Sequence, residues 1–443
     1  MSTHNLLSGF QDFLPESMLA RNNLVSVVRG CYEKFGFLPQ DTPCLERTEL
    51  LTGKYGDNEK MIYSFEDHGG RRVSLRYDLT VPLTRFINMY INNIVFPYRR
   101  YQVGLSWRAD KPGKGRFREF MQMDADIIGD ESVLADVEVL TLMASAMEAL
   151  GVRSTIRFNC RQILDSLVEI CQLDSETSVS LMRSIDKFDK IGQAGVLAEL
   201  AGIGFSPGII NKVGDYLKIT GTNAEVLQGL TRLLGEAGAF QTGIALLSSI
   251  TDLLAVQSHS LVDFEIDPTI ARGLDYYTGL IFETRFVENP EFGSVCSGGR
   301  YDRLLKRPNG EFLPAVGLSI GIDRLLAAMK SVGKAPVFKT TTQVFIANFD
   351  EKLSSEYLKL AGELRQAGVA VEIFSKQSKI AKQLDIANKK YIPLVVLVGP
   401  DEISLSQVLL KDMRAGVQIT VQRDQFVPAV LERLGLNNHP LAV

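Results

Sequence analysis

The chain has little of what extracellular, metal-binding and membrane proteins need. Its 443 residues contain five cysteines, an odd number, scattered and nowhere spaced as Cys-x-x-Cys. This usage argues against a disulfide framework and a structural zinc site, and it is typical of a reducing cytoplasm. No apolar run approaches the roughly 20 residues that a membrane helix needs, and no basic stretch leads into an apolar one at the N-terminus. We therefore expect a cytoplasmic protein with no membrane span and no secretion signal.

The chain also lacks a basic excess. Its formal net charge is -4, whereas general nucleic-acid binders usually carry a surplus of Lys and Arg. A protein that holds one RNA and then releases it needs only local basic patches, so the acidic average does not exclude such a role. The length predicts about two to four domains, at about 150 residues each.

Four segments follow one another along the chain. Helix and strand patterns alternate over residues 1–158, and residues 159–258 have a helical texture rich in Leu, Ala, Gly and Ser. Strand and glycine-turn patterns return over residues 259–332. After a linker at 333–341, a new unit extends over residues 342–443.

Local patterns predict individual elements within these segments. A helix is expected over Leu19–Phe35, a strand over Val73–Tyr77, and a helix over Glu131–Leu150 that ends at Gly151. Beyond residue 342 the expected elements alternate between strand and helix, over 344–347, 352–367, 369–373, 378–389 and 393–398. Strands separated by helices of this length imply crossovers, and therefore a parallel or mixed α/β sheet.

The most informative stretch is Arg272–Gly279, with the sequence Arg-Gly-Leu-Asp-Tyr-Tyr-Thr-Gly. It puts a guanidinium, a carboxylate and two adjacent phenols around one glycine. Further along, Ser297–Asp302 forms a second glycine turn that carries an arginine, a tyrosine and an aspartate. Either peptide alone could be a simple turn between two strands. Both together, in this order, indicate a binding site.

A basic hairpin is expected over Trp107–Phe120. One strand delivers Arg108, a loop broken by proline and glycine carries four more basic residues, and a return strand follows. Because strand side chains alternate between two faces, the return strand presents one set together, namely Phe120, Gln122, Asp124 and Asp126. Such a hairpin can hold a polyanion with its arginines and stack a flat base on its phenylalanine. The alternative is a basic tip that is merely exposed to water.

A third pattern lies at Gly317–Leu326. Small residues at every second position, Gly317, Ser319 and Gly321, predict one face of a strand that another group approaches closely. The chain then turns helical, with Asp323 in the first turn, where an acid is favourable. Arg324 is thereby expected at a strand-to-helix junction.

These motifs together resemble those of a known family. Arg272–Gly279 and Ser297–Asp302 resemble the two signature peptides of histidyl-tRNA synthetases. The hairpin resembles motif 2 of class II aminoacyl-tRNA synthetases, and Gly317–Leu326 resembles motif 3. Gly36–Pro43 matches motif 1, which forms a dimer interface in that class. The resemblance covers nearly the whole chain, from Asp12–Pro15 to the final α/β unit.

The resemblance implies a fold and a domain organisation. The fold is an α+β catalytic core built on a mainly antiparallel sheet, with a helical insertion and a C-terminal α/β anticodon-binding domain. The core would comprise residues 1–158 and 259–332, interrupted by the insertion at 159–258. The linker 333–341 would lead to the anticodon-binding domain at 342–443.

The resemblance also implies site residues. The α-ammonium of histidine would be held by Asp78, Thr80 and Gln122. The imidazole nitrogens would meet Asp126 and Tyr277, with Tyr276 beside them. Arg108 would bind the α-phosphate of ATP, and Arg272 is the family's distinctive catalytic arginine. The remaining ATP contacts would be Arg116 and Arg324 at the triphosphate end and Phe120 at the adenine.

Two departures from the family pattern are visible. Asp78 and Asp126 occupy positions where many bacterial members have Glu, a choice associated with a eukaryote-like branch. Trp107 stands where Phe or Tyr is commoner. The shorter carboxylates keep the charge and the acceptor capacity, so we expect activity to be retained.

The implied activity joins L-histidine to ATP and passes the histidyl group to the 3′ end of tRNA(His), with Mg²⁺ on the phosphates and the chain as a homodimer. None of the four histidines lies in these motifs, so a histidine general base is not expected, and no protein metal site is expected. The alternative is a catalytically silent paralogue, such as the histidine-sensing regulatory subunit of ATP phosphoribosyltransferase. Such subunits usually lack the C-terminal domain and have degraded ATP arginines, whereas this chain has the C-terminal unit and retains Arg108, Arg272 and Arg324.

Two segments each allow two interpretations. The insertion at 159–258 is either a clamp on the acceptor arm of the tRNA or an inert helical decoration. In the C-terminal unit Lys376, Lys379 and Lys382 recur every third residue, which at helical spacing makes a basic stripe. A stripe of this kind is either a solvated helix face or, given the resemblance, an RNA-facing surface.

Overall fold

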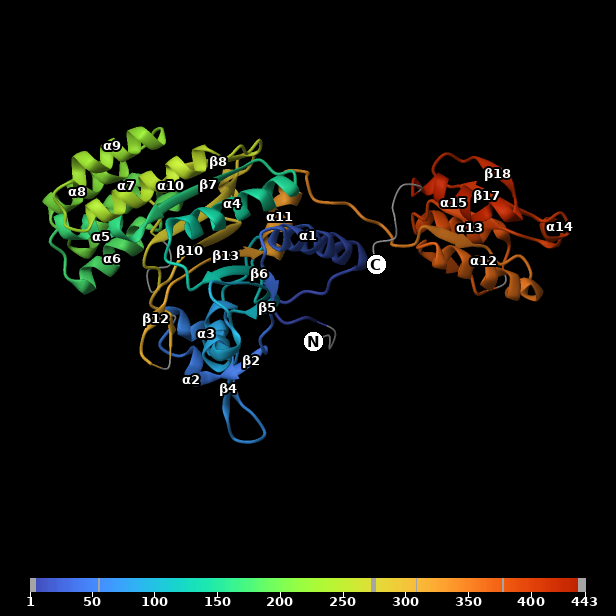
Figure 1. Ribbon diagram of the computed structural model, residues 1–443, viewed down its shortest axis with the longest axis horizontal. Helices are drawn as coiled ribbons and strands as arrows, with labels where there is room; N and C mark the ends of the chain where they lie inside the picture. The colour runs from blue at the N-terminus through green and yellow to red at the C-terminus, as the bar shows by residue number, and fades with distance from the viewer. Residues whose placement is uncertain (1–4, 55, 272–275, 308, 377, 437–443) are drawn as a thin grey trace. The chain divides into compact units, whose positions relative to one another are not determined.

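The computed structural model describes residues 5–54, 56–271, 276–307, 309–376 and 378–436. The chain divides into two units (Figure 1), one made of Met1–Asp12 with Arg21–Ala335 and the other of Phe13–Ala20 with Pro336–Val443. Among the helices within the described ranges, none is long and apolar enough to cross a membrane.

The first unit is built on one eight-stranded sheet. All neighbouring strands in it are antiparallel except the pair at each edge, which is parallel. This confirms the mainly antiparallel core that the resemblance implied. In spatial order the strands are β1 (Leu38–Pro39), β5 (Tyr98–Trp107), β6 (Glu119–Ile128), β13 (Ala315–Gly321), β10 (Cys296–Arg300), β9 (Leu280–Phe286), β7 (Ser154–Cys160) and β8 (Val262–Ile266).

The order of strands brings distant motifs together. The hairpin β5–β6 lies beside β13, which carries the third sequence pattern, and β13 lies beside β10, which carries the second glycine turn. Segments separated by the whole helical insertion in sequence are therefore neighbours in the middle of the sheet. Long-range pairing of this kind places residues from several motifs on one face.

Three helices of this unit are important for the site (Figure 1). They are α1 (Pro15–Lys34), which belongs to this unit from Arg21 onward, α4 (Val133–Ala149) and α11 (Ile322–Ser331). Helix α1 begins one turn before the expected Leu19, because proline is well tolerated at a first helical position and Glu16 is a favourable acid in the first turn. The Tyr32 hydroxyl of α1 donates to the Met123 carbonyl of β6 at 3.1 Å and fixes this helix to the sheet.

Shorter elements surround the sheet. The expected strand Val73–Tyr77 is β4, which ends two residues early; the next residue, Arg76, donates from Nε to the Leu105 carbonyl at 2.7 Å. The small elements of this region are β2 (Leu45–Arg47), β3 (Ser64–Glu66), β4 (Arg72–Leu75), α2 (Thr48–Leu51), α3 (Thr80–Tyr90), β11 (Leu305–Lys306), β12 (Phe312–Leu313) and the 3-10 turns Gly56–Met61, Ile91–Asn93 and Pro290–Phe292.

The segment expected to be helical does form helices. Asp174, Ser206 and Thr222 each cap a helix with a side-chain oxygen that accepts from a backbone N–H, which explains where these helices begin. An ion pair of 3.1 Å between Asp189 and Arg157 of β7 ties this segment to the sheet. The helices are α5 (Arg161–Ile170), α6 (Ser175–Ile185), α7 (Phe188–Ile203), α8 (Pro207–Leu217), α9 (Asn223–Leu234) and α10 (Phe240–Ala255).

The second unit contains the expected mixed α/β sheet. Its strands, in spatial order, are β15 (Val371–Ile373), β14 (Val344–Ile346), β16 (Leu394–Leu397), β17 (Gln407–Asp412) and β18 (Gln418–Gln422). The first three are parallel and the last two antiparallel. The helices are α12 (Ser354–Gln366), α13 (Ile380–Lys389), α14 (Pro400–Ser404) and α15 (Phe426–Leu434), with 3-10 turns at Glu351–Leu353 and Arg423–Gln425.

The prediction of a basic stripe on one helix face is wrong. Helix α13 begins at Ile380, so Lys376 and Lys379 precede it and only Lys382 lies on the helix. Lys379 has an extended backbone, with φ -54° and ψ 135°. All three side chains are exposed, but they do not share a helix face.

Candidate active site

Two cavities meet on one face of the eight-stranded sheet. The first has a volume of about 250 Å³ and contains Arg116 and Arg324 in its lining, and the second has about 230 Å³ and contains Asp78 and Tyr277. Four residues line both cavities, namely Arg108, Gln122, Ser297 and Ser319. The shared residues make the two cavities adjoining parts of one site.

The alternation expected along the return strand β6 is confirmed. Gln122 lines both cavities, and Asp124 and Asp126 line the second. The intervening residues Met123 and Ala125 are fully buried in the core. One face of β6 therefore supplies polar groups to the site while the other packs the protein interior.

Arg108 lies where the two cavities adjoin. It directly follows β5, and its Nε donates to the Tyr77 carbonyl at 3.0 Å. The guanidinium carbon lies 4.3 Å from the centre of the Tyr77 ring and 5.2 Å from that of Phe120. Two aromatic rings and one carbonyl thus orient a permanent positive charge toward the site.

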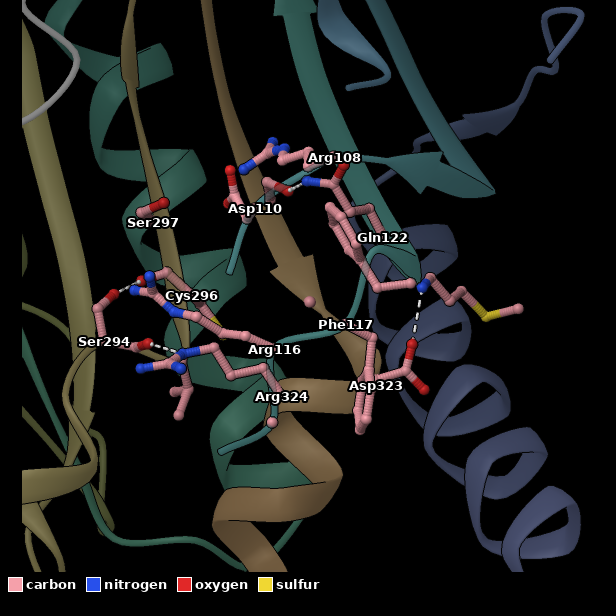
Figure 2. Close-up of a pocket in the computed structure, with 16 residues that line it drawn as sticks. Arg108, Asp110, Arg116, Phe117, Gln122, Ser294, Cys296, Ser297, Asp323 and Arg324 are labelled. Atoms are coloured by element: carbon pink, nitrogen blue, oxygen red, sulfur yellow. Dashed lines mark hydrogen bonds between the residues drawn. The ribbon is translucent and has the colours of Figure 1, made fainter. Parts of the chain in front are cut away.

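The loop of the hairpin approaches helix α11 closely. Gly115 has a positive φ of 66°, and a Cβ atom there would lie 3.1 Å from the Ala327 Cβ and 3.3 Å from the Phe292 ring. A larger residue would be strained in this conformation and would push the loop away. Glycine at this position allows Arg116 to line the first cavity next to Arg324 (Figure 2).

Arg324 lies in the first turn of α11, directly after β13, as the sequence predicted. Its Nε donates to the Ser294 carbonyl at 2.6 Å and its Nη2 to the Phe292 carbonyl at 2.7 Å. The guanidinium also lies 4.8 Å from the centre of the Phe292 ring. Figure 2 shows this side chain beside Arg116 on one side of the cavity.

Asp323 does more than favour the first turn of α11. Its side chain is buried, pairs with Arg21 of α1 at 3.0 Å, and accepts from the Met121 backbone N–H of β6 at 2.8 Å. One carboxylate thus joins α1, β6 and α11 at the floor of the first cavity. The sequence indicated the position of this acid but not its partners.

The second cavity holds the residues that the resemblance assigns to histidine. The Asp78 carboxylate accepts from the Thr80 backbone N–H at 3.1 Å and from the Val81 N–H at 2.9 Å, so it caps the start of α3. Gln122 donates from Nε2 to the Ser319 hydroxyl at 2.8 Å. Within the described part of the chain its Oε1 is buried with no hydrogen-bond partner, which leaves an acceptor beside Asp78 and Thr80 in the same cavity lining.

Asp126 is held from two sides. Its Oδ2 lies 2.6 Å from Nη2 of Arg100, which is directly opposite on β5 and fully buried, and its Oδ1 accepts a hydrogen bond from the Tyr301 hydroxyl. A Cβ atom on Gly317, opposite on β13, would lie 2.0 Å from Oδ1. The predicted close approach to the small-residue face of this strand is therefore made by the Asp126 carboxylate.

Two tyrosines line the other side of this cavity. The rings of Tyr276 and Tyr277 lie 4.6 Å apart, and the Tyr276 ring makes an edge contact of 6.2 Å with Tyr301. Burial raises the pKa of Tyr277 to about 12 and that of Tyr276 well above its ordinary value. Both hydroxyls therefore keep their protons at neutral pH, and a hydrogen bond joins them to each other.

Not every signature residue points into the site. Arg300 pairs with Asp136 of α4 at 2.9 Å and donates to the Asp130 carbonyl at 3.0 Å, so it joins β10 to the start of α4. Arg272 lies outside the described residues. No role was predicted for Arg100, while Tyr301 and Ser319 were noted only as parts of the second glycine turn and of the small-residue face; all three contact predicted site residues.

Comparison with known proteins identifies the same two parts of the chain. The family model described as Histidyl-tRNA synthetase matches residues 9–325, and the one described as Anticodon binding domain matches residues 343–433. A histidine–tRNA ligase of Rhodopirellula baltica is 40% identical over 413 residues, which is 92% of each chain. One of Helicobacter acinonychis is 37% identical over 447 residues and covers 100% of both chains.

Solved structures agree. The crystal structure of a histidyl-tRNA synthetase from a Nostoc species has a TM-score of 0.86 and 33% identity, and covers 98% of this chain and 100% of that one. A Bacillus halodurans structure titled ATP phosphoribosyltransferase regulatory subunit/histidyl-tRNA synthetase has a TM-score of 0.73 at 22% identity, covers 87% of this chain and 97% of that one, and shows a shared fold only. Relatives this similar over nearly the full length show that the chain belongs to the histidyl-tRNA synthetase family of class II aminoacyl-tRNA synthetases.

Proposed function

We propose that this protein activates L-histidine with ATP to histidyl-adenylate and transfers the histidyl group to the 3′ end of tRNA(His). The observation that supports this most strongly is the pair of adjoining cavities that share Arg108. An amino acid in one cavity and a nucleotide in the other would place the amino-acid carboxylate and the α-phosphate at this arginine. That is the arrangement an adenylate-forming enzyme needs.

In the first step a carboxylate oxygen of histidine attacks the α-phosphorus of ATP, and the bond to the β-phosphate breaks to release pyrophosphate. No protein nucleophile is needed, so catalysis is positioning together with stabilisation of charge on the phosphate oxygens. Arg108 and Arg272 take this catalytic role, because a guanidinium gives planar and permanently charged contacts. In the second step a ribose hydroxyl of the tRNA attacks the carbonyl carbon, and AMP leaves.

The remaining ATP contacts follow from the lining of the first cavity. Arg116 and Arg324 hold the triphosphate end, and Phe120 packs on the adenine. Their presence around one cavity next to Arg108 supports these roles. Within the described residues no three His, Cys, Asp or Glu side chains form a group that could hold a metal ion. Mg²⁺ would arrive bound to ATP, with ligands from phosphate oxygens and water.

The second cavity would bind histidine. Asp78, Thr80 and Gln122 hold the α-ammonium, a role supported by the Oε1 atom of Gln122, which is buried and accepts no hydrogen bond from any described residue. Asp126 and Tyr277 meet the imidazole nitrogens, with Tyr276 beside them. Closed polar sites of this kind discriminate by on the order of 10⁴-fold, because a wrong amino acid leaves buried groups unpaired.

Further proposals concern the whole chain. Residues 1–158 and 259–332 form the catalytic core, and residues 159–258 form an insertion domain that clamps the tRNA acceptor arm. The linker 333–341 leads to the anticodon-binding domain at 342–443. The motif 1 region forms a homodimer interface, for which the exposure of Leu38 on edge strand β1 gives support. We place the protein in the cytoplasm.

The regulatory-subunit alternative is less well supported. The anticodon-domain match at residues 343–433 and the arginines around the first cavity both favour the ligase. The deciding experiment is pyrophosphate exchange with each of the twenty amino acids. Exchange that depends on histidine alone supports the proposal, and histidine binding without any exchange would favour a silent histidine sensor.

A further inference from the structure

The ring end of the amino-acid cavity contains a second acid that has no assigned role. Asp124 lies on the same face of β6 as Gln122 and Asp126, and its side chain lines the cavity although it is only 2% exposed. Residues two apart on one strand face are separated by about 6.5–7 Å. A ligand that reaches both Gln122 and Asp126 must therefore lie over Asp124, which stands between them.

The carboxylates of Asp124 and Asp126 differ in the partners that they have within the protein. Oδ2 of Asp126 forms an ion pair with Arg100 at 2.6 Å, without the geometry of a hydrogen bond, and Oδ1 accepts a hydrogen bond from the Tyr301 hydroxyl. In contrast, Oδ1 of Asp124 is buried and has no hydrogen-bond partner among the described residues. A buried carboxylate oxygen without a partner is costly to leave unpaired. The substrate ring is the group that would supply the missing donor.

The charge around Asp124 limits the ionisation of this end of the cavity. The groups that face it are Arg100 on β5, Asp126 on β6, Ser319 on β13, Asp78 before α3, Tyr277 and Tyr32 of α1. Among these the only cation is one guanidinium, and it already pairs with Asp126. Burial raises the pKa of Asp124 to about 7, while Arg100 acts in the opposite direction.

We propose that Asp124 is a specificity-determining residue that binds the imidazole of histidine together with one proton, which the ring and the carboxyl share in the complex. This inference rests on the proposed histidine-activating function. Asp126 stays paired with Arg100, and Asp124 supplies the acceptor that completes the ring contact. A side chain of similar size without a ring proton to share would leave this acid unpaired.

The proposal predicts a proton count for binding. The free imidazole has a pKa of about 6.5, close to that of Asp124, so at about pH 8 both groups are mostly deprotonated before they meet. A complex with one shared proton must then take that proton from solution. Without a role for Asp124, neutral histidine would bind at this pH with no proton uptake.

The test is calorimetric titration of the full-length protein with histidine at about pH 8, in buffers with different heats of ionisation. The parent should take up about one proton, and Asp124→Asn should take up close to none. In pyrophosphate exchange the variant should raise the histidine KM roughly 10- to 150-fold, as expected for loss of a charged hydrogen bond, and should leave the ATP KM within about twofold.

A matched control is Asp136→Asn, which changes a buried acid that pairs with Arg300 outside both cavities. It should keep the proton uptake of the parent. Binding by the parent without proton uptake, or an unchanged histidine KM in Asp124→Asn, overturns the inference alone. If the variant does not fold, the parent titration still decides. Absence of any histidine-dependent exchange by the parent would overturn the proposed function and this inference with it.

Discussion

Arg21 and Asp323 form a buried ion pair of 3.0 Å across 302 residues of sequence. The same carboxylate accepts the Met121 backbone N–H, so it connects α1, β6 and α11. Because Asp323 directly precedes Arg324, this connection fixes the turn of helix that presents an arginine to the first cavity, the proposed ATP site.

Asp323→Ala should lower the free energy of unfolding by about 3–5 kcal/mol, because it leaves the Arg21 charge buried without this partner. It should also raise the KM for ATP, since the first turn of α11 loses its anchor. Urea denaturation and pyrophosphate exchange measure the two effects. Asp385→Ala is the control, because its ion pair with Lys389 is exposed and should contribute little. Equal stability of the two variants would refute the role of the buried pair.

Arg272→Ala should reduce pyrophosphate exchange by on the order of 10²–10³, because one preorganised positive contact to the reacting phosphate is lost. Histidine binding, measured by calorimetry, should be largely retained. Arg303→Ala removes an exposed arginine outside both cavities and should leave exchange near the level of the parent. Exchange by Arg272→Ala within a few-fold of the parent would remove Arg272 from the catalytic set.

Asp126→Ala should weaken the binding of histidine by roughly 2–4 kcal/mol and the binding of ATP far less. The structure adds a cost, because Arg100 would be left buried without its partner, which typically destabilises a protein by about 3–5 kcal/mol. Tyr277→Phe deletes a neutral hydroxyl. It should weaken the binding of histidine by about 1–2 kcal/mol and leave the stability of the folded protein nearly unchanged. KM values for both substrates test this, and an Asp126→Ala enzyme that loses only ATP affinity would contradict the assignment.

The raised pKa of Asp124 should make the free energy of unfolding depend on pH. Its pKa is about 7 in the folded protein and about 3.9 in an unfolded chain. The folded state binds this proton more tightly, so the stabilisation is fully present below about pH 4 and is lost as the pH rises through about 7. Between these values the free energy of unfolding of Asp124→Asn should gain on that of the parent, by at most on the order of 4 kcal/mol. A constant difference between the two proteins across this range would contradict the prediction.

A chain that ends near Lys334 should still activate histidine but charge tRNA poorly. All the cavity-lining residues of the proposed site lie before this point, and the anticodon-domain match lies after it. Pyrophosphate exchange and tRNA charging separate the two activities, and sedimentation should show that the shortened chain is still a dimer. Charging by the shortened chain at the rate of the full chain would refute the anticodon role.

The sequence was most informative where local spacing determines geometry. The alternation of Gln122, Asp124 and Asp126 and the strand-to-helix junction at Arg324 were both predicted from neighbours in the chain. The start of α1 was placed one turn late, because apolar periodicity does not register the proline and acid that begin the helix. The prediction of a lysine stripe was wrong for a similar reason. Residues spaced three apart share a helix face only if all of them lie on the helix, and α13 begins at Ile380, after Lys376 and Lys379.

The parts of the site that escaped prediction depend on pairing between strands. Arg100 meets Asp126 only through the register of β5 and β6, and Tyr301 reaches it from the end of β10, two strands away from β6. No pattern within either segment carries that information. The Asp323–Arg21 pair is likewise a product of tertiary packing between helices at opposite ends of the catalytic unit.

The position of Arg108 between the two cavities has a consequence for inhibitor design. If the two cavities bind histidine and ATP as proposed, a compound that joins an imidazole-bearing amino acid to an adenosine through a linker that cannot be cleaved would occupy both at once. Its two halves would share a single loss of translational and rotational freedom, so it should bind far more tightly than either half alone. The linker atoms next to this guanidinium are where a negative or strongly polar group would add most to affinity and selectivity.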